Sequence, residues 1–88
     1  ITVGLNELQD EDKVSIFPNP IKDVLHLRLE KELIQSIELF NTKGQLVLKQ
    51  RGINNKNLSL NLEAYVSGIY FIRIISNHSM TTKKVIIE

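Results

Sequence analysis

The sequence lacks cysteine and tryptophan, and no apolar run approaches the roughly 18 residues that a membrane-spanning helix needs. Without cysteine the chain has no disulfide, no thiol nucleophile and no cysteine-based metal site, so its stability comes from packing and hydrogen bonds. The aromatic residues are three Phe and two Tyr, and most of the apolar side chains are Ile, Leu and Val. Branched aliphatic side chains pack well on pleated surfaces, so this composition favours strands.

Motifs for catalysis and metal binding are also missing from the sequence. The candidate acids, bases and ligands are His26, His78, Asp23 and Glu38, and their spacing brings no two of them together. There is no Gly-x-Ser-x-Gly, His-Glu-x-x-His or phosphate-binding glycine loop. The acidic run 10–12 lacks the glycine of a calcium loop. We therefore expect a protein that is not an enzyme and that has no metal ion or cofactor.

Charge is unevenly spread along the chain, although the net charge is only +1. Four of the ten acidic residues lie in the first twelve positions, and every Lys and Arg comes at or after Lys13. The basic residues are scattered singly apart from Lys83-Lys84, and no aromatic platform accompanies them, so no nucleic acid is expected as a partner. The acidic, aperiodic start predicts a linker over residues 1–13 to an upstream domain, and one domain over residues 14–88.

Alternation of apolar and polar residues is the dominant pattern from Val14 onward. In residues 23–29, for example, Leu25, Leu27 and Leu29 share one face. Such segments recur at intervals of roughly ten residues, and no window shows the helical period of about 3.6 residues. The expected strands are 14–17, 23–29, 35–41, 45–50, 57–62, 69–75 and 80–87. This pattern predicts an all-β protein, a seven-stranded antiparallel β-sandwich.

Two connections carry recognisable turn chemistry. Pro18-Asn19-Pro20 removes two backbone donors, so the segment 14–17 is expected at an edge or corner of the sandwich. Residues 41–44 predict a hairpin turn with a positive φ at the glycine. On the strand that returns from this turn, Leu46 and Leu48 are expected to point inward.

Two further segments are assigned from composition. Residues 51–56 contain one Gly and two Asn, so they are expected to form a loop. Residues 69–75 are mostly apolar on both faces, which predicts a central strand.

Several motifs, taken in order, make the chain resemble a known family. They are Phe17-Pro18-Asn19-Pro20 before the alternating strand Val24 to Leu29, then Ile37 to Val47, then Gly68-Ile69-Tyr70-Phe71, and finally Thr82-Lys83-Lys84-Val85-Ile86-Ile87-Glu88. Over residues 14–88 the sequence resembles the type A C-terminal sorting domain of the type IX secretion system of Bacteroidetes. The order and spacing of the motifs, more than any one of them, carry this resemblance.

The resemblance implies an immunoglobulin-like sandwich carried by a cargo protein. Such a cargo enters the periplasm with a signal peptide and is then directed through the outer-membrane secretion machinery. A sortase-like cysteine protease removes the sorting domain, and the cargo is secreted or stays at the cell surface. In this chain the cleavage is expected in the segment before Val14.

The residues that match the family motifs are the recognition candidates. They are Pro18, Asn19, Pro20, Gly44, Gly68, Tyr70, Lys83, Lys84 and Val85. Outside the last strand we expect them to serve the fold. In the last strand two interpretations stay open: lysines on both faces protect a sheet edge from unwanted pairing, or a receptor reads the strand by edge pairing or by its terminal carboxylate.

Other functions also stay open. A carbohydrate-binding or adhesive accessory module would use exposed aromatic rings, for which the candidates are Phe17, Tyr65 and one face of the strand that carries Tyr70 and Phe71. A plain structural spacer of the same fold would need no recognition site. A weak edge-to-edge dimer through the first or last strand is open as well, because sandwiches keep unpaired edges.

Overall fold

The computed structural model describes residues 14–18 and 20–88, so the predicted linker over residues 1–13 and Asn19 of the proline motif lie outside the described residues. The described chain forms seven strands: β2 (Val14–Phe17), β3 (Val24–Leu29), β4 (Ile34–Asn41), β5 (Leu46–Asn55), β6 (Asn57–Asn61), β7 (Gly68–Ser76) and β8 (Met80–Ile87). This part of the chain contains no helix, and hence none long and apolar enough to cross a membrane. The predicted all-β class is confirmed.

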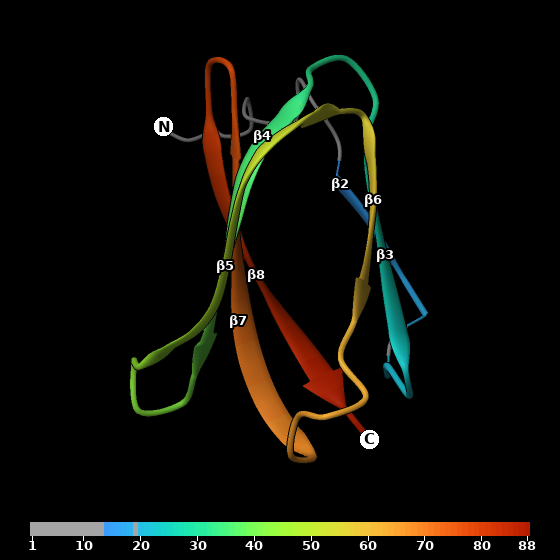
Figure 1. The fold of residues 1–88 in the computed structure, drawn as a ribbon, viewed down its shortest axis with the longest axis vertical. Coiled ribbons are helices and arrows are strands. Elements are labelled where there is room, and N and C mark those ends of the chain that lie inside the picture. Colours follow the sequence, from blue (N-terminus) through green and yellow to red (C-terminus); the bar gives the residue numbers. More distant parts are fainter. Residues whose placement is uncertain (1–13, 19) are drawn as a thin grey trace, which may run out of the picture.

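The strands form two antiparallel sheets that face each other (Figure 1). The smaller sheet has the order β2-β3-β6 and the larger one β5-β4-β7-β8. The chain crosses between the sheets after β3, β5 and β6, which gives the predicted immunoglobulin-like sandwich of three strands against four. The predicted edge position of residues 14–17 is confirmed, because β2 pairs only with β3. The predicted central strand is also confirmed, because β7 lies between β4 and β8.

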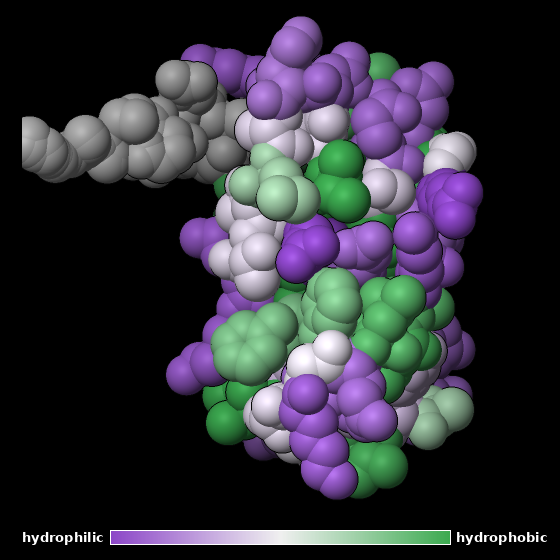
Figure 2. All heavy atoms as spheres, turned by 90° about the vertical axis from the view of Figure 1, so that its left-hand side faces the viewer, coloured by the Kyte–Doolittle hydropathy of each residue, from purple (hydrophilic) through white to green (hydrophobic). Residues whose placement is uncertain are grey.

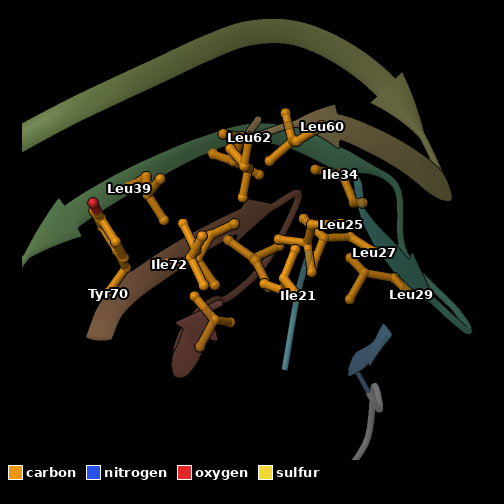
Figure 3. Packing of buried hydrophobic residues seen from close by; sticks show 14 residues of the cluster. Ile21, Leu25, Leu27, Leu29, Ile34, Leu39, Leu60, Leu62, Tyr70 and Ile72 are labelled. Atoms are coloured by element: carbon orange, nitrogen blue, oxygen red, sulfur yellow. The ribbon is translucent and has the colours of Figure 1, made fainter. Parts of the chain in front are cut away.

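The core consists of the inward-facing aliphatic residues of both sheets (Figure 3). On β3 the predicted inward residues Leu25, Leu27 and Leu29 are all buried. The other buried apolar residues are Ile21, Ile34, Ile37, Leu39, Leu60, Leu62, Tyr70, Ile72, Ile74, Val85 and Ile87. Complete burial of one Leu or Ile side chain contributes roughly 1.5–3 kcal/mol, so this cluster is what holds the two sheets together in a chain without disulfides.

The predicted hairpin between β4 and β5 is confirmed. The side-chain Oδ1 of Asn41 accepts hydrogen bonds from the backbone N–H groups of Lys43 (2.9 Å) and Gln45 (3.0 Å), and Gly44 has a φ of +83°. The inward position predicted for Leu46 is wrong, because this side chain is 49% exposed. A register shift after Leu39 places Leu46 opposite Phe40 on the outer face, while Leu48 stays opposite Leu39 and packs against the core.

The loop predicted over residues 51–56 is wrong, because β5 continues through Asn55. Gly52 and Asn54 have positive φ values of 68° and 49°, and the pairing with β4 shifts between Ile34 and Ser36. The turn-forming residues therefore bend a strand and do not interrupt it. In Figure 1 the bent strand arches over one end of the sandwich and leads into β6 of the other sheet.

Candidate recognition site at the last strand

β8 forms one edge of the larger sheet, and β7 is the one strand that pairs with it among the described residues. Val85 and Ile87 are buried, whereas Lys83 and Lys84 are exposed. By strand alternation Lys83 lies on the inner face with Val85, and Lys84 lies on the outer face with Ile86. Within the described residues neither lysine has an ion-pair partner. The edge therefore presents one unpaired ammonium group on each face.

The end of β8 is held from a second side by Ile21. The N–H of Ile21 donates to the carbonyl of Ile86 at 2.8 Å, and the N–H of Glu88 donates to the carbonyl of Ile21 at 2.7 Å. These bonds form an isolated parallel bridge opposite Ile87, which we call the Ile21 bridge. The Ile21 side chain is fully buried in the core. Sequence reasoning missed this residue, and the only signal for it was one apolar residue between Pro20 and Lys22.

The segment with Pro18 and Pro20 connects β2 to Ile21, the residue that forms the Ile21 bridge. Phe17 ends β2 in the smaller sheet, and Pro18 and Pro20 are exposed on the path to Ile21. Neither proline has a backbone N–H, so neither continues the pairing of β2 with β3. The motif thus carries the chain from the edge of one sheet to the last strand of the other.

Gly68 and Tyr70 lie directly beside the end of β8. Gly68 pairs with Ile87, and Tyr70 pairs with Val85. The phenol of Tyr70 donates to the carbonyl of Val66 at 2.7 Å, and its ring meets the ring of Tyr65 edge to face at 6.5 Å. Gly68 enters β7 with a φ of +150°, a value that L side chains rarely adopt. Both residues hold the β6–β7 connection next to the end of β8.

The matched motif residues meet at one end of the sandwich. At this end β4 leads into β5, β7 begins and β8 finishes, as Figure 1 shows. Asn41, which precedes the Gly44 turn, pairs with Tyr70. Gly44 itself belongs to the opposite edge of the larger sheet, since β4 and β7 separate β5 from β8. The structure therefore brings Ile21, Gly68 and Tyr70 to β8, places Pro18 and Pro20 on the path to Ile21, and leaves Gly44 apart.

The residues considered for catalysis or metal binding lie in separate places. His26 is on the outer face of the smaller sheet, where its Nδ1 is 2.9 Å from Oγ of Ser59 and its ring stacks on Phe17. His78 is in the β7–β8 turn, with Nδ1 3.9 Å from the carboxylate of Glu32. Across residues 14–18 and 20–88, no group of three His, Cys, Asp or Glu side chains is arranged to hold a metal ion.

Comparison with known proteins shows a family and a relative that the chain resembles. Residues 15–88 match the family described as the secretion system C-terminal sorting domain. An ulvan lyase of Nonlabens ulvanivorans is 29% identical over 65 residues, which cover 73% of this chain and 12% of that enzyme. The chain thus corresponds to a small part of this relative.

The matched range runs from the second residue of β2 to Glu88, so it takes in the proline motif, the Ile21 bridge and the whole of β8. The sandwich and the family match agree with the resemblance found in the motifs. The chain belongs to the family of secretion system C-terminal sorting domains, and it is a signal that directs an attached cargo protein to export by type IX secretion, into the medium or to the cell surface.

Proposed function

We propose that residues 14–88 are the complete folded signal and that the outer-membrane secretion machinery reads it at β8, through Lys83 and Lys84. The supporting observation is the contrast within one strand between two exposed lysines and the buried Val85 and Ile87 that follow. Burial fixes the strand, so the two lysine side chains leave the edge from defined backbone positions, one on each face. Val85 is then a positioning residue.

We also propose that the domain takes no part in chemistry and is a substrate of a sortase-like protease that cuts within residues 1–13. The support for this boundary is that Val14 pairs with Leu29 and contacts the core, so a cut at or after Val14 would fall within the sandwich. Mass spectrometry of the released cargo tests the proposal. A new C-terminus inside residues 1–13 is expected, and one inside the sandwich would contradict it.

Charge reversal separates recognition from edge protection. A charge of either sign discourages edge pairing, whereas a site built from carboxylates needs a positive charge. In a cargo fused to the chain, Lys83→Glu with Lys84→Glu should therefore reduce the exported amount on the order of tenfold, as expected for a loss of about 1.4 kcal/mol of binding free energy. The measurement is the ratio of exported to periplasmic cargo in a bacterium that has type IX secretion.

The control for this experiment reverses two exposed charges elsewhere, Arg28→Glu with Lys56→Glu. It changes the net charge by the same amount and leaves β8 intact. If both double variants lower export equally, or if neither does, then Lys83 and Lys84 are not the recognised groups.

One observation favours the carbohydrate-binding alternative as a second candidate. Phe17 is 50% exposed, its ring stacks on His26 at a centroid distance of 5.3 Å, and Ser59 hydrogen-bonds His26 on the same face. Such a flat aromatic and polar face suits a sugar ring. Tyr65 does not contribute to it, because it is half-buried against the core. Micromolar binding on a glycan array that Phe17→Ala abolishes would favour this function.

A weak edge-to-edge dimer through β2 or β8 also stays a proposal. The support is that β2 pairs with β3 alone, and that β8 pairs only with β7 apart from the Ile21 bridge at its end, within the described part of the chain. Sedimentation equilibrium of the chain tests it, and a single monomeric species at the highest soluble concentration would contradict it.

A further inference from the structure

The outer face of the larger sheet carries an apolar patch that none of the described residues covers. We define it as Phe40, Leu46, Ile69, Phe71 and Ile86. Strand pairing brings these residues together: Phe40 lies opposite both Leu46 and Phe71, and Ile69 lies opposite Ile86. Figure 2 shows apolar side chains gathered over the lower part of this face, below a band of polar ones.

The members of the patch are exposed to an unusual degree for such large apolar side chains. Leu46 is 49% exposed, Ile69 43%, Phe71 37% and Ile86 37%. The outer face of the smaller sheet is different, since β3 and β6 present Arg28, His26, Asn57, Ser59 and Asn61 there, and Phe17 is the one exposed large apolar side chain among the residues described on that face. Because contiguous apolar patches on soluble domains often mark interaction sites, this difference points to a protein partner for the larger sheet.

A charged row borders the patch. Glu38 lies between Lys49 and Arg73, with N–O distances of 3.5 Å and 3.1 Å, and the guanidinium carbon of Arg73 is 5.0 Å from the centre of the Phe40 ring. Phe71 pairs with Phe40 of β4 on one side and with Lys84 of β8 on the other. Glu88 follows the buried Ile87 and lies on the outer face with Ile86. Three cations and two anions thus border the patch, so its border carries a net charge of +1.

The charges around the patch indicate which kind of partner could bind it. A second copy of the chain would bring the same positive border against this one, which like-charge repulsion disfavours. A lipid surface is disfavoured because Glu38 places a carboxylate within the cationic row. A protein with an apolar surface edged by carboxylates fits both features.

We propose that the apolar patch is a docking surface for such a protein within the secretion machinery. The patch lies next to Lys83 and Lys84 of β8, the proposed recognition site. The inference rests on the proposed function, and it extends the recognised surface from β8 to the outer face of the larger sheet. Lys84 connects the two surfaces, because it belongs to β8 and borders Phe71 in the patch.

The test uses a cargo fused to the whole 88-residue chain in a bacterium with type IX secretion. The patch variant is Ile69→Thr, Phe71→Thr and Ile86→Thr, in which threonine keeps the preference for strands. The matched control is Met80→Thr, also on β8 and 62% exposed, but outside the patch. A thermal melt of each purified chain verifies that the fold is kept.

The patch variant should lower the exported fraction about tenfold or more, with cargo retained in the periplasm, while the control stays within about twofold. Equal export of the patch variant and the unmodified fusion would overturn the inference. If the unmodified fusion is not exported at all, the proposed function fails as well, so the two failures are distinguishable.

Two further measurements exclude the other occupants. In the first, the unmodified chain is mixed with vesicles that contain lipopolysaccharide, and the bound fraction is measured. In the second, the sedimentation of the chain alone is measured over a range of protein concentrations. Vesicle binding that the patch variant loses, or a dimer that the patch variant dissociates, would overturn the assignment to a protein partner. A monomer that does not bind vesicles supports it. If the patch variant does not fold, Phe71→Thr alone is used with the same readouts.

Discussion

Gly44 shows how one residue sets a turn. With a φ of +83° it lies in the left-handed region, and a Cβ built on it would meet no atom within 4 Å. The cost of replacing it is therefore one of backbone conformation and not of space. Because an L residue in this region is disfavoured by about 1–2 kcal/mol, Gly44→Ala should lower the free energy of unfolding by about 1 kcal/mol.

The Gly44→Asn variant is the matched comparison, because asparagine tolerates the left-handed region better. It should lose less stability than Gly44→Ala. Urea unfolding of both variants measures the difference. Equal losses would show that the turn does not depend on the conformation of this residue.

Some single-residue positions followed from the sequence and others did not. The burial of Leu25, Leu27 and Leu29 follows from alternation alone. Leu46 does not, because a register shift relative to β4 reverses its face, and such a shift depends on the partner strand. Ile21 is missed for a related reason, since its only regular partner, β8, is remote in sequence.

At the scale of elements, β8 is joined to the domain from two sides. β7 pairs along its whole length, and the Ile21 bridge adds two hydrogen bonds at its end. Ile21→Ala should cost about 2–5 kcal/mol of unfolding free energy, as other deletions of buried aliphatic groups do. It should also speed amide exchange at Glu88, whose N–H donates to Ile21.

Hydrogen exchange with urea unfolding checks this expectation, and Val66→Ala is the control because that side chain is largely exposed. The control should lose little stability and should leave the exchange at Glu88 unchanged. Unchanged exchange at Glu88 in Ile21→Ala would show that the bridge does not hold the end of β8.

The elements themselves were largely predictable, with one instructive exception. Seven strands and the β4–β5 hairpin follow from alternation and turn residues. The bend in β5 does not, because Gly52 and Asn54 have the composition of a loop. Whether such residues end a strand or bend it depends on a neighbouring strand to pair with, and β4 supplies one.

At the scale of the whole molecule, β8 has two roles: it carries the proposed recognition lysines and it completes the core. Removing residues 83–88 deletes the buried Val85 and Ile87 and both hydrogen bonds of the Ile21 bridge. We expect the truncated chain to lose its cooperative thermal transition, measured by circular dichroism, because a small core has little stability to spare. The charge-reversed Lys83→Glu and Lys84→Glu variant should keep that transition.

This expectation changes how loss of export on truncation is interpreted. A truncated chain that is not exported has lost both its shape and its charged strand, whereas the charge-reversed variant loses only the second. A truncated chain that still melts cooperatively would show that the two roles are separable.

The site was less predictable than the fold. The lysines are visible in the sequence, but their lack of ion-pair partners in the described chain depends on where the remaining charges lie in space. The apolar patch requires the registers of β4, β5, β7 and β8 together. Its members come from four separate segments, so no linear motif contains them.

The Ile21 bridge has a consequence for the order in which the domain is made. Synthesis releases Ile21 early and Ile87 near the end of this segment, so the first residue of the bridge waits for nearly the whole domain before its partner exists. Contacts so remote in sequence also slow folding. The core therefore cannot close around the end of β8 until this strand has been made.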